Sequence, residues 1–112
     1  MTYRGYSWEN EVKKKYLDKG IVLNLKINSY ADLLYIPFCV CGVYLIECKS
    51  TKKSKWYPNK RERKQYEKLM ELSSNLKGLL SHIIQVRYWI KENGVEKRLK
   101  LEEVGREYFK NV

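Results

Sequence analysis

An acidic and a basic residue interrupt an otherwise apolar stretch of the chain, VYLIECKS at residues 43–50. Side chains alternate across a β-strand, so Glu47 and Lys49 share one face with the apolar residues that precede them. A carboxylate can ligate a hard divalent cation, and an amine beside it can orient or help to deprotonate a water molecule. The simpler alternative is that the strand ends here and both residues are solvated. Which interpretation is right depends on the other acidic residues that the neighbouring strands and helices bring close to this pair.

A second carboxylate is expected beside this pair. Asp32 opens the predicted strand 32–38, and a tight turn leads from there into the predicted strand 43–49. If the two strands pair as an antiparallel hairpin, Asp32 at the start of one lies near Glu47 at the end of the other. Mg²⁺ or Mn²⁺ is usually held by one or two carboxylates with water and substrate phosphate, and the backbone carbonyl of Cys48 would add another oxygen ligand.

A third acidic residue, Glu9, belongs to a predicted helix over residues 7–19, with Ser7 as its N-cap and Gly20 as its stop. Glu9 shares one helical face with Val12 and Tyr16, so we expect its side chain to point inward. A first-turn acid favoured by the helix dipole is the alternative interpretation of Glu9.

The remaining elements complete an α/β domain. Apolar patterns predict a strand at 21–27, an amphipathic helix at 61–77 and a strand at 82–90. Asn93–Gly94 predicts a two-residue hairpin turn into a strand at 95–101, and a short helix is expected at 102–109. The order of elements predicts a single domain over residues 1–112, with a mixed sheet of about five strands flanked by helices.

The net charge of +10 on 112 residues indicates a polyanionic partner, most simply nucleic acid. Generic solubility is the alternative, but the charge is clustered, at residues 13–15 and 49–64. The second cluster forms a predicted basic loop at 50–60 that runs into the second long helix. Its expected DNA-contacting residues are Lys52, Lys53, Lys55, Lys60 and Arg61.

The chain has no apolar stretch long enough to span a bilayer and no signal-peptide pattern, so an intracellular, cytoplasmic protein without a membrane partner is expected. Three cysteines and a single histidine do not provide the ligand set of a zinc or iron–sulfur site, so reduced thiols are expected.

In their order and spacing, the segments RGYSWE, YADLLY and LIECK resemble the PD-(D/E)XK nuclease superfamily, and most closely its archaeal Holliday junction resolvases of cellular or viral origin. The resemblance covers residues 3–75 and, loosely, the final hairpin. It implies a restriction-endonuclease-like core and Mg²⁺-dependent hydrolysis of DNA at four-way junctions, with Mn²⁺ as a substitute. It also implies a homodimer, which suits two symmetric cuts in a junction of approximate two-fold symmetry. A viral protein would act in the cytoplasm of its host cell.

The resemblance also assigns roles to individual residues. The catalytic set is Glu9, Asp32, Glu47 and Lys49, and the metal ligands are Asp32, Glu47 and Glu9 with the Cys48 carbonyl. Arg4 and Gly5 match the family's opening motif, and Lys26 and Ser29 are the nearest matches to its basic and serine residues before the aspartate. With the basic loop, the expected DNA-binding residues are therefore Arg4, Lys26, Ser29, Lys52, Lys53, Lys55, Lys60 and Arg61.

Departures from the family pattern bear on the substrate more than on catalysis. Asn10 stands where arginine is frequent, and Ala31 replaces the proline that names the superfamily. Lys26 lacks the bidentate fork of an arginine. Another nuclease of the superfamily acting on duplex, flap or single-stranded DNA is the nearest alternative, and a non-catalytic DNA-binding protein of the same fold is a further one.

Several polar and aromatic residues keep two interpretations. Gln65 is expected either near the site or as an ordinary surface residue, the latter being the simpler interpretation. Trp56 and Tyr57 are either anchors of the basic loop or platforms for stacking on bases. The remaining large aromatics, Tyr66, Tyr88 and Trp89, are expected in the core or in an interface.

Overall fold

The computed structural model describes residues 3–26, 30–39 and 42–109, and side chains from residue 7 onward within these ranges. Its elements, in chain order, are α1 (Tyr3–Tyr16), β1 (Gly20–Asn24), β2 (Leu33–Pro37), β3 (Val43–Thr51), α2 (Lys60–Asn75), α3 (Leu79–Ile83), β4 (Ile84–Glu92), β5 (Val95–Lys100) and α4 (Leu101–Tyr108).

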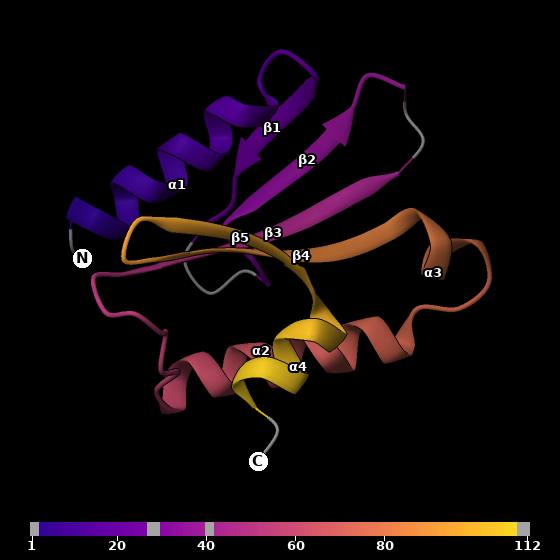
Figure 1. Ribbon diagram of the computed structural model, residues 1–112. Helices are drawn as coiled ribbons and strands as arrows, with labels where there is room; N and C mark the ends of the chain where they lie inside the picture. Colours follow the sequence, from indigo (N-terminus) through magenta and orange to yellow (C-terminus); the bar gives the residue numbers. More distant parts are fainter. Residues whose placement is uncertain (1–2, 27–29, 40–41, 110–112) are drawn as a thin grey trace.

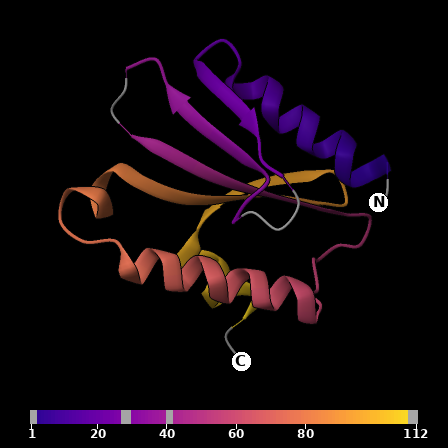
Figure 2. The same ribbon diagram turned by 180° about the vertical axis from the view of Figure 1, so that it is seen from behind.

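The strands form one mixed sheet in the order β1-β2-β3-β4-β5. β1, β2 and β3 pair antiparallel, β3 and β4 pair parallel, and β4 and β5 form an antiparallel hairpin. Helix α1 covers one face of the sheet, and α2 with α4 covers the other (Figure 1 and, from behind, Figure 2). The expectation of an α/β fold with a five-stranded mixed sheet flanked by helices is confirmed.

Each face of the sheet has its own hydrophobic core. On the α1 face, Trp8 and Val12 pack against strand residues that include Leu33 and Ile46. On the other face, the α2 and α4 helices pack over β4 around the fully buried Tyr88. Because alternate strand residues point to opposite faces, the two cores fix which side chains of β3 face α2.

Local sequence signals explain several element boundaries. Asn59 caps α2 through a reciprocal capping box with Glu62, in which each side chain accepts from the other residue's backbone N–H. Asn93 and Gly94 have φ of 47° and 83°, as a two-residue hairpin turn requires. Gly20 is needed because a Cβ there would lie 2.2 Å from the Ile36 carbonyl oxygen.

Other boundaries differ from the sequence-based expectation. α1 already includes Ser7, so the predicted N-cap at Ser7 is wrong. β1 ends at Asn24 rather than continuing toward residue 27. The segment 82–90 is not strand throughout, because the one-turn helix α3 precedes β4 and ends at Ile83.

Two further findings concern membranes and cysteines. No helix within the described ranges is long and apolar enough to cross a membrane. Cys39 is disulfide-bonded whereas Cys48 is a free thiol, so the expectation of reduced thiols is wrong for Cys39.

Candidate functional site

Asp32 directly precedes β2, and the antiparallel pairing of β2 with β3 places it beside Glu47 of β3. Leu33 pairs with Ile46, and the Asp32 N–H donates to the Ile46 carbonyl oxygen at 3.1 Å. The Asp32 side chain accepts a hydrogen bond from the Cys48 backbone N–H at 2.8 Å. The predicted proximity of Asp32 and Glu47 is therefore confirmed, although β3 continues beyond Glu47 to Thr51, and the Cys48 N–H holds the Asp32 carboxylate in place.

Glu47 and Lys49 lie on the same face of β3 and form an ion pair, with 2.9 Å between Lys49 Nζ and Glu47 Oε2. Glu47 is 1% exposed, which excludes the interpretation that the strand end is solvated. Burying a charged carboxylate is costly unless it is paired and hydrogen-bonded. The buried carboxyl group of Glu47 therefore needs polar partners from the surrounding elements.

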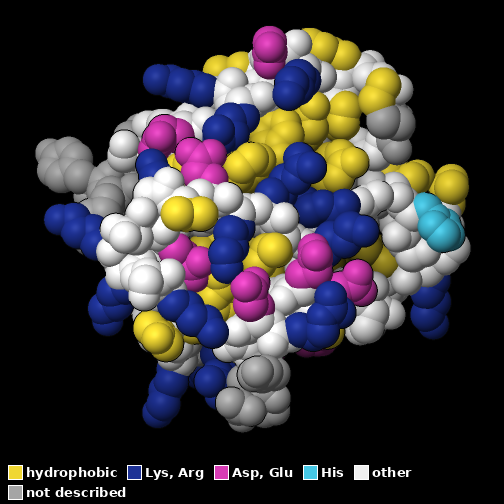
Figure 3. All heavy atoms as spheres, in the orientation of Figure 1, with side chains coloured by type: hydrophobic (Ala, Val, Ile, Leu, Met, Phe, Trp, Pro, Cys, Tyr) yellow, Lys and Arg dark blue, Asp and Glu magenta, His cyan; other side chains and the backbone are white. Residues whose placement is uncertain are grey.

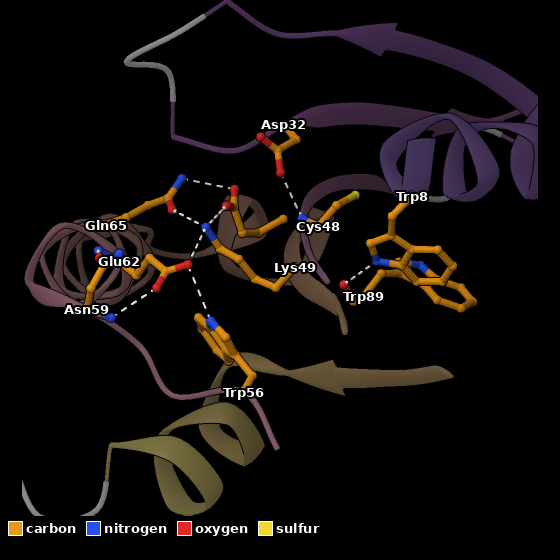
Figure 4. Close-up of polar contacts among 10 residues, drawn as sticks. Trp8, Asp32, Cys48, Lys49, Trp56, Asn59, Glu62, Gln65 and Trp89 are labelled. Carbon is orange, nitrogen blue, oxygen red and sulfur yellow. Dashed lines mark hydrogen bonds and ion pairs between the residues drawn. The ribbon is translucent and has the colours of Figure 1, made fainter. Parts of the chain in front are cut away.

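Helix α2 supplies the other hydrogen-bond partner of this pair. Gln65 Nε2 donates to Glu47 Oε1 at 2.9 Å, and Lys49 Nζ donates to Gln65 Oε1 at 3.3 Å (Figure 4). The interpretation of Gln65 as an ordinary surface residue is therefore wrong. Its amide both donates to the acid and accepts from the amine, so it fixes the geometry of the pair.

The sequence-based interpretation missed Glu62, which also contacts Lys49. Glu62 Oε2 lies 3.4 Å from Lys49 Nζ and accepts from the Trp56 indole N–H at 3.3 Å. Glu62 and Gln65 are three residues apart and therefore share one face of α2, which was the available signal. The interpretation of Trp56 as a loop anchor is confirmed, since it is 5% exposed, whereas Tyr57 is 68% exposed.

Glu9 lies on α1 and is less closely connected to the other acids. It is half-buried, and Glu9 Oε2 accepts from Asn24 Nδ2 at 3.1 Å. Lys13 donates to the other end of the same amide at 2.6 Å, so Asn24 links the acid to the base. Glu9 interacts electrostatically with Asp32. The structure thus brings Asp32, Glu47 and Lys49 together and places Glu9 at the border of this group.

Burial dominates the electrostatics of the three acids. Burial, together with the charge of Asp32, raises the pKa of Glu47 to about 8, although Lys49 opposes the shift. Burial also raises the pKa of Asp32 above its usual range, and the pKa of Glu9 is raised by burial and by Asp32. Burial disfavours the charged amine of Lys49, but Glu47 and Glu62 outweigh it and raise the pKa of Lys49. Lys49 is therefore a cation, and burial favours the protonated forms of the neighbouring acids Glu47 and Asp32.

These donors fit a magnesium-type site better than a closed metal centre. Among the residues that the structure describes, no three His, Cys, Asp or Glu side chains are grouped closely enough to hold a metal ion. Mg²⁺ needs only one or two carboxylates, with water and substrate phosphate as its other ligands. Asp32 and Glu47 are two such carboxylates, and the charge of Asp32 raises the pKa of Glu47, a repulsion that a shared cation would relieve. The proposed roles of Glu9 and of the Cys48 carbonyl as further ligands stay predictions.

A buried tyrosine borders the pair from the neighbouring strand. Tyr88 pairs with Glu47 in the parallel β3–β4 register and is 0% exposed. In the described part of the chain its hydroxyl has no hydrogen-bond partner. Burial, and then the charge of Glu47, raise the pKa of this hydroxyl. The expectation that Tyr88 belongs to the core is confirmed.

The expected DNA-binding side chains that the structure describes are all exposed: Lys26, Lys52, Lys53, Lys55, Lys60 and Arg61. Three of them follow β3 in the loop that Trp56 anchors. The predicted roles of Ser29 and of the Arg4 side chain lie outside the described residues.

Comparison of the chain with models of known protein families and with curated proteins finds no match.

Proposed function

We propose that the protein is a Mg²⁺-dependent, structure-selective DNA endonuclease that resolves four-way junctions by paired symmetric nicks. The observation that carries this proposal is the buried Glu47, which lies next to Asp32 and is ion-paired with Lys49 on the central strand of the sheet. The two adjacent acids, Asp32 and Glu47, repel each other when both are charged, which opposes folding, and ionisable residues perturbed in this way cluster at functional sites.

The residues present suit phosphodiester hydrolysis. In this reaction a water oxygen attacks phosphorus, one P–O ester bond breaks, and the leaving oxygen takes up a proton. A bound Mg²⁺ would supply charge stabilisation at the phosphate and a more acidic water. Asp32 and Glu47 would hold it. Because its pKa is raised, Lys49 is protonated and would orient the water or face the developing negative charge rather than accept a proton.

The neighbours of these residues would keep them in position. Gln65 and Glu62 both contact Lys49, so the amine is directed by three partners from β3 and α2. The mixed sheet, with a hairpin carrying the acids and helices on both faces, supports the restriction-endonuclease-like core that the sequence motifs imply. The exposed lysines of the loop that follows β3 would bind the phosphates of the DNA.

Carboxamide variants of the two acids test the proposal. Asp32→Asn and Glu47→Gln should each lower Mg²⁺-dependent cleavage of a four-way junction by more than 100-fold, on the order expected for a lost electrostatic contribution at the reacting group. Junction binding, measured by fluorescence anisotropy in EDTA, should stay within about threefold of wild type, because affinity comes from the basic residues.

The matched control is Glu67→Gln, which removes an exposed acid of α2 away from the pair. It should leave cleavage unchanged. Loss of binding as severe as the loss of cleavage in both acid variants would mean that these residues are structural, and would contradict the assignment of the site.

A further inference from the structure

A second region that combines aromatic and basic residues lies on the opposite face of the sheet from Glu47 and Lys49. It is a groove of about 290 Å³ near the beginning of β3 and the end of β2, lined chiefly by Tyr16, Lys19, Tyr35, Tyr44, Arg87 and Arg98. Figure 3 shows a hydrophobic area over β2 with Lys and Arg side chains along its border. Nothing in the proposed nuclease mechanism uses this groove.

Its floor is a row of tyrosine rings that pack against one another. The ring centroids of Tyr16 and Tyr35 are 4.2 Å apart, and Tyr35 stacks on Tyr44 with 5.8 Å between centroids. The Tyr16 hydroxyl accepts from the Trp89 indole N–H at 2.9 Å. Tyr35 is buried, whereas Tyr44 is half-buried and borders the open groove. The groove therefore presents a partly exposed aromatic ring that packs against a second tyrosine.

The walls of the groove carry cations. Arg87 lies over the Tyr44 ring at 5.5 Å and donates to the carbonyl oxygen of the preceding residue at 3.0 Å, so its guanidinium is preorganised. Arg98 lies over the Trp89 ring at 5.9 Å. Among the described residues, no acidic side chain forms an ion pair with Lys19, Arg87 or Arg98.

Elsewhere on this face of the sheet, two lysines form ion pairs with acids. Lys15 pairs with Glu96 at 3.1 Å, and Lys91 pairs with Glu11 at 3.4 Å. The charge of Asp18 contributes to the raised pKa of the Tyr35 hydroxyl, but less than burial, Tyr16 and Tyr44 do. Within the described ranges, Lys19, Arg87 and Arg98 therefore place positive charge without an ion-paired acid beside the tyrosine rings.

We infer that this groove binds an unpaired segment of a single-stranded nucleic acid, with a base against the Tyr44 ring and phosphates on Arg87 and Arg98. Aromatic side chains beside a positively charged groove are what a flexible single strand needs, since every base has a face that can stack and every phosphate has a charge. A duplex offers the phosphates but keeps its base faces covered. The binding does not depend on the nuclease activity, because it uses the other face of the sheet.

The test is the binding of a fluorescent 12-nucleotide oligothymidylate in EDTA, measured by anisotropy at several salt concentrations. Arg87→Gln/Arg98→Gln should lower the salt slope by about 1.4, from about 0.7 for each phosphate of a single strand that the variant no longer binds. Tyr44→Leu should weaken binding about tenfold, whereas Tyr44→Phe, which keeps the ring, should bind like wild type. Thermal unfolding establishes that each variant is folded.

The matched control is Lys68→Gln/Arg106→Gln, which removes two exposed basic residues from α2 and α4 on the other side of the sheet. It should leave the affinity for the oligonucleotide within about threefold of wild type, since neither side chain would contact the strand. Equal loss of affinity in both double variants would show that only net charge matters and would overturn the inference. So would unchanged affinity in Tyr44→Leu, or a groove variant that changes the oligomeric state instead of binding. Because no cleavage is measured, these outcomes are independent of whether the protein is a nuclease.

Discussion

At the scale of single residues, Glu47 carries the clearest physical consequence. Its pKa is about 8 in the folded protein and near 4.5 in an unfolded chain. Between these values the folded state binds more protons than the unfolded state, so the free energy of unfolding must fall as the pH rises. Asp32 and Glu9 act in the same direction because their pKa values are also raised.

We therefore predict that metal-free protein loses stability between about pH 4.5 and pH 8, with a slope of up to about 1.4 kcal/mol per pH unit from Glu47 alone. Glu47→Gln should flatten this slope, although it also removes the partner of Lys49. Urea unfolding at a series of pH values in EDTA measures it, with Glu67→Gln as the control. Equal slopes in wild type and Glu47→Gln would contradict the account of this buried acid.

Some residues of the candidate site could be predicted from the sequence and others could not. Asp32, Glu47 and Lys49 were within reach of the sequence, because strand alternation and hairpin register alone bring them together. Glu62 was not, and a place near the site was only one of two alternatives for Gln65, because their role depends on how α2 docks on the sheet. Glu62 also has a complete local explanation as the partner of the Asn59 cap, which concealed its interaction with Lys49.

At the scale of elements, the loop between β3 and α2 connects the site to the expected DNA surface. Trp56 fixes it, since its backbone N–H donates to buried Glu92 at 2.7 Å and its indole N–H to Glu62. Lys52, Lys53 and Lys55 precede this anchor and are exposed. A loop anchored in this way would present the charges of these exposed lysines on the side of the domain where β3 ends.

Neutralising Lys52, Lys53 and Lys55 together to Gln should therefore weaken binding to every DNA shape. The salt dependence should fall by about 0.9 for each duplex phosphate that the loop no longer binds. Anisotropy titrations with a four-way junction and a linear duplex measure both effects, and Lys68, Lys77 and Lys100 changed to Gln form a control of equal charge. If the salt slope of the loop variant equals that of wild type, the loop does not contact the DNA.

Elements are predictable where local chemistry decides them and less so where packing does. The Asn93–Gly94 turn follows from turn preferences, whereas α2 ends at Asn75 with Leu76 as an extended C-cap, short of the predicted end at residue 77. The Ser7 cap predicts the wrong start for α1, because the helix begins at Tyr3. Trp8 is buried near this end of the helix, so its packing on the sheet is a tertiary contact that cap preferences do not include.

At the scale of the whole molecule, the proposed function requires two sites. The chain carries one group of Asp32, Glu47 and Lys49, whereas a four-way junction has two-fold symmetry and needs two matched cuts. We therefore propose a homodimer with a two-fold axis, each subunit cutting one strand. The net charge of +10 per chain would favour association with the densely charged junction.

The most direct measurement uses wild-type protein with Mg²⁺, a four-way junction with a mobile core, and a linear duplex of the same sequence. The expected result is a pair of nicks at symmetry-related positions in two opposing strands, abolished by EDTA, with the linear duplex mostly uncut. Equal cutting of junction and duplex would contradict junction selectivity while keeping a nuclease. The absence of cutting on every DNA with Mg²⁺ and with Mn²⁺ would contradict the central claim that Asp32, Glu47 and Lys49 form a catalytic site.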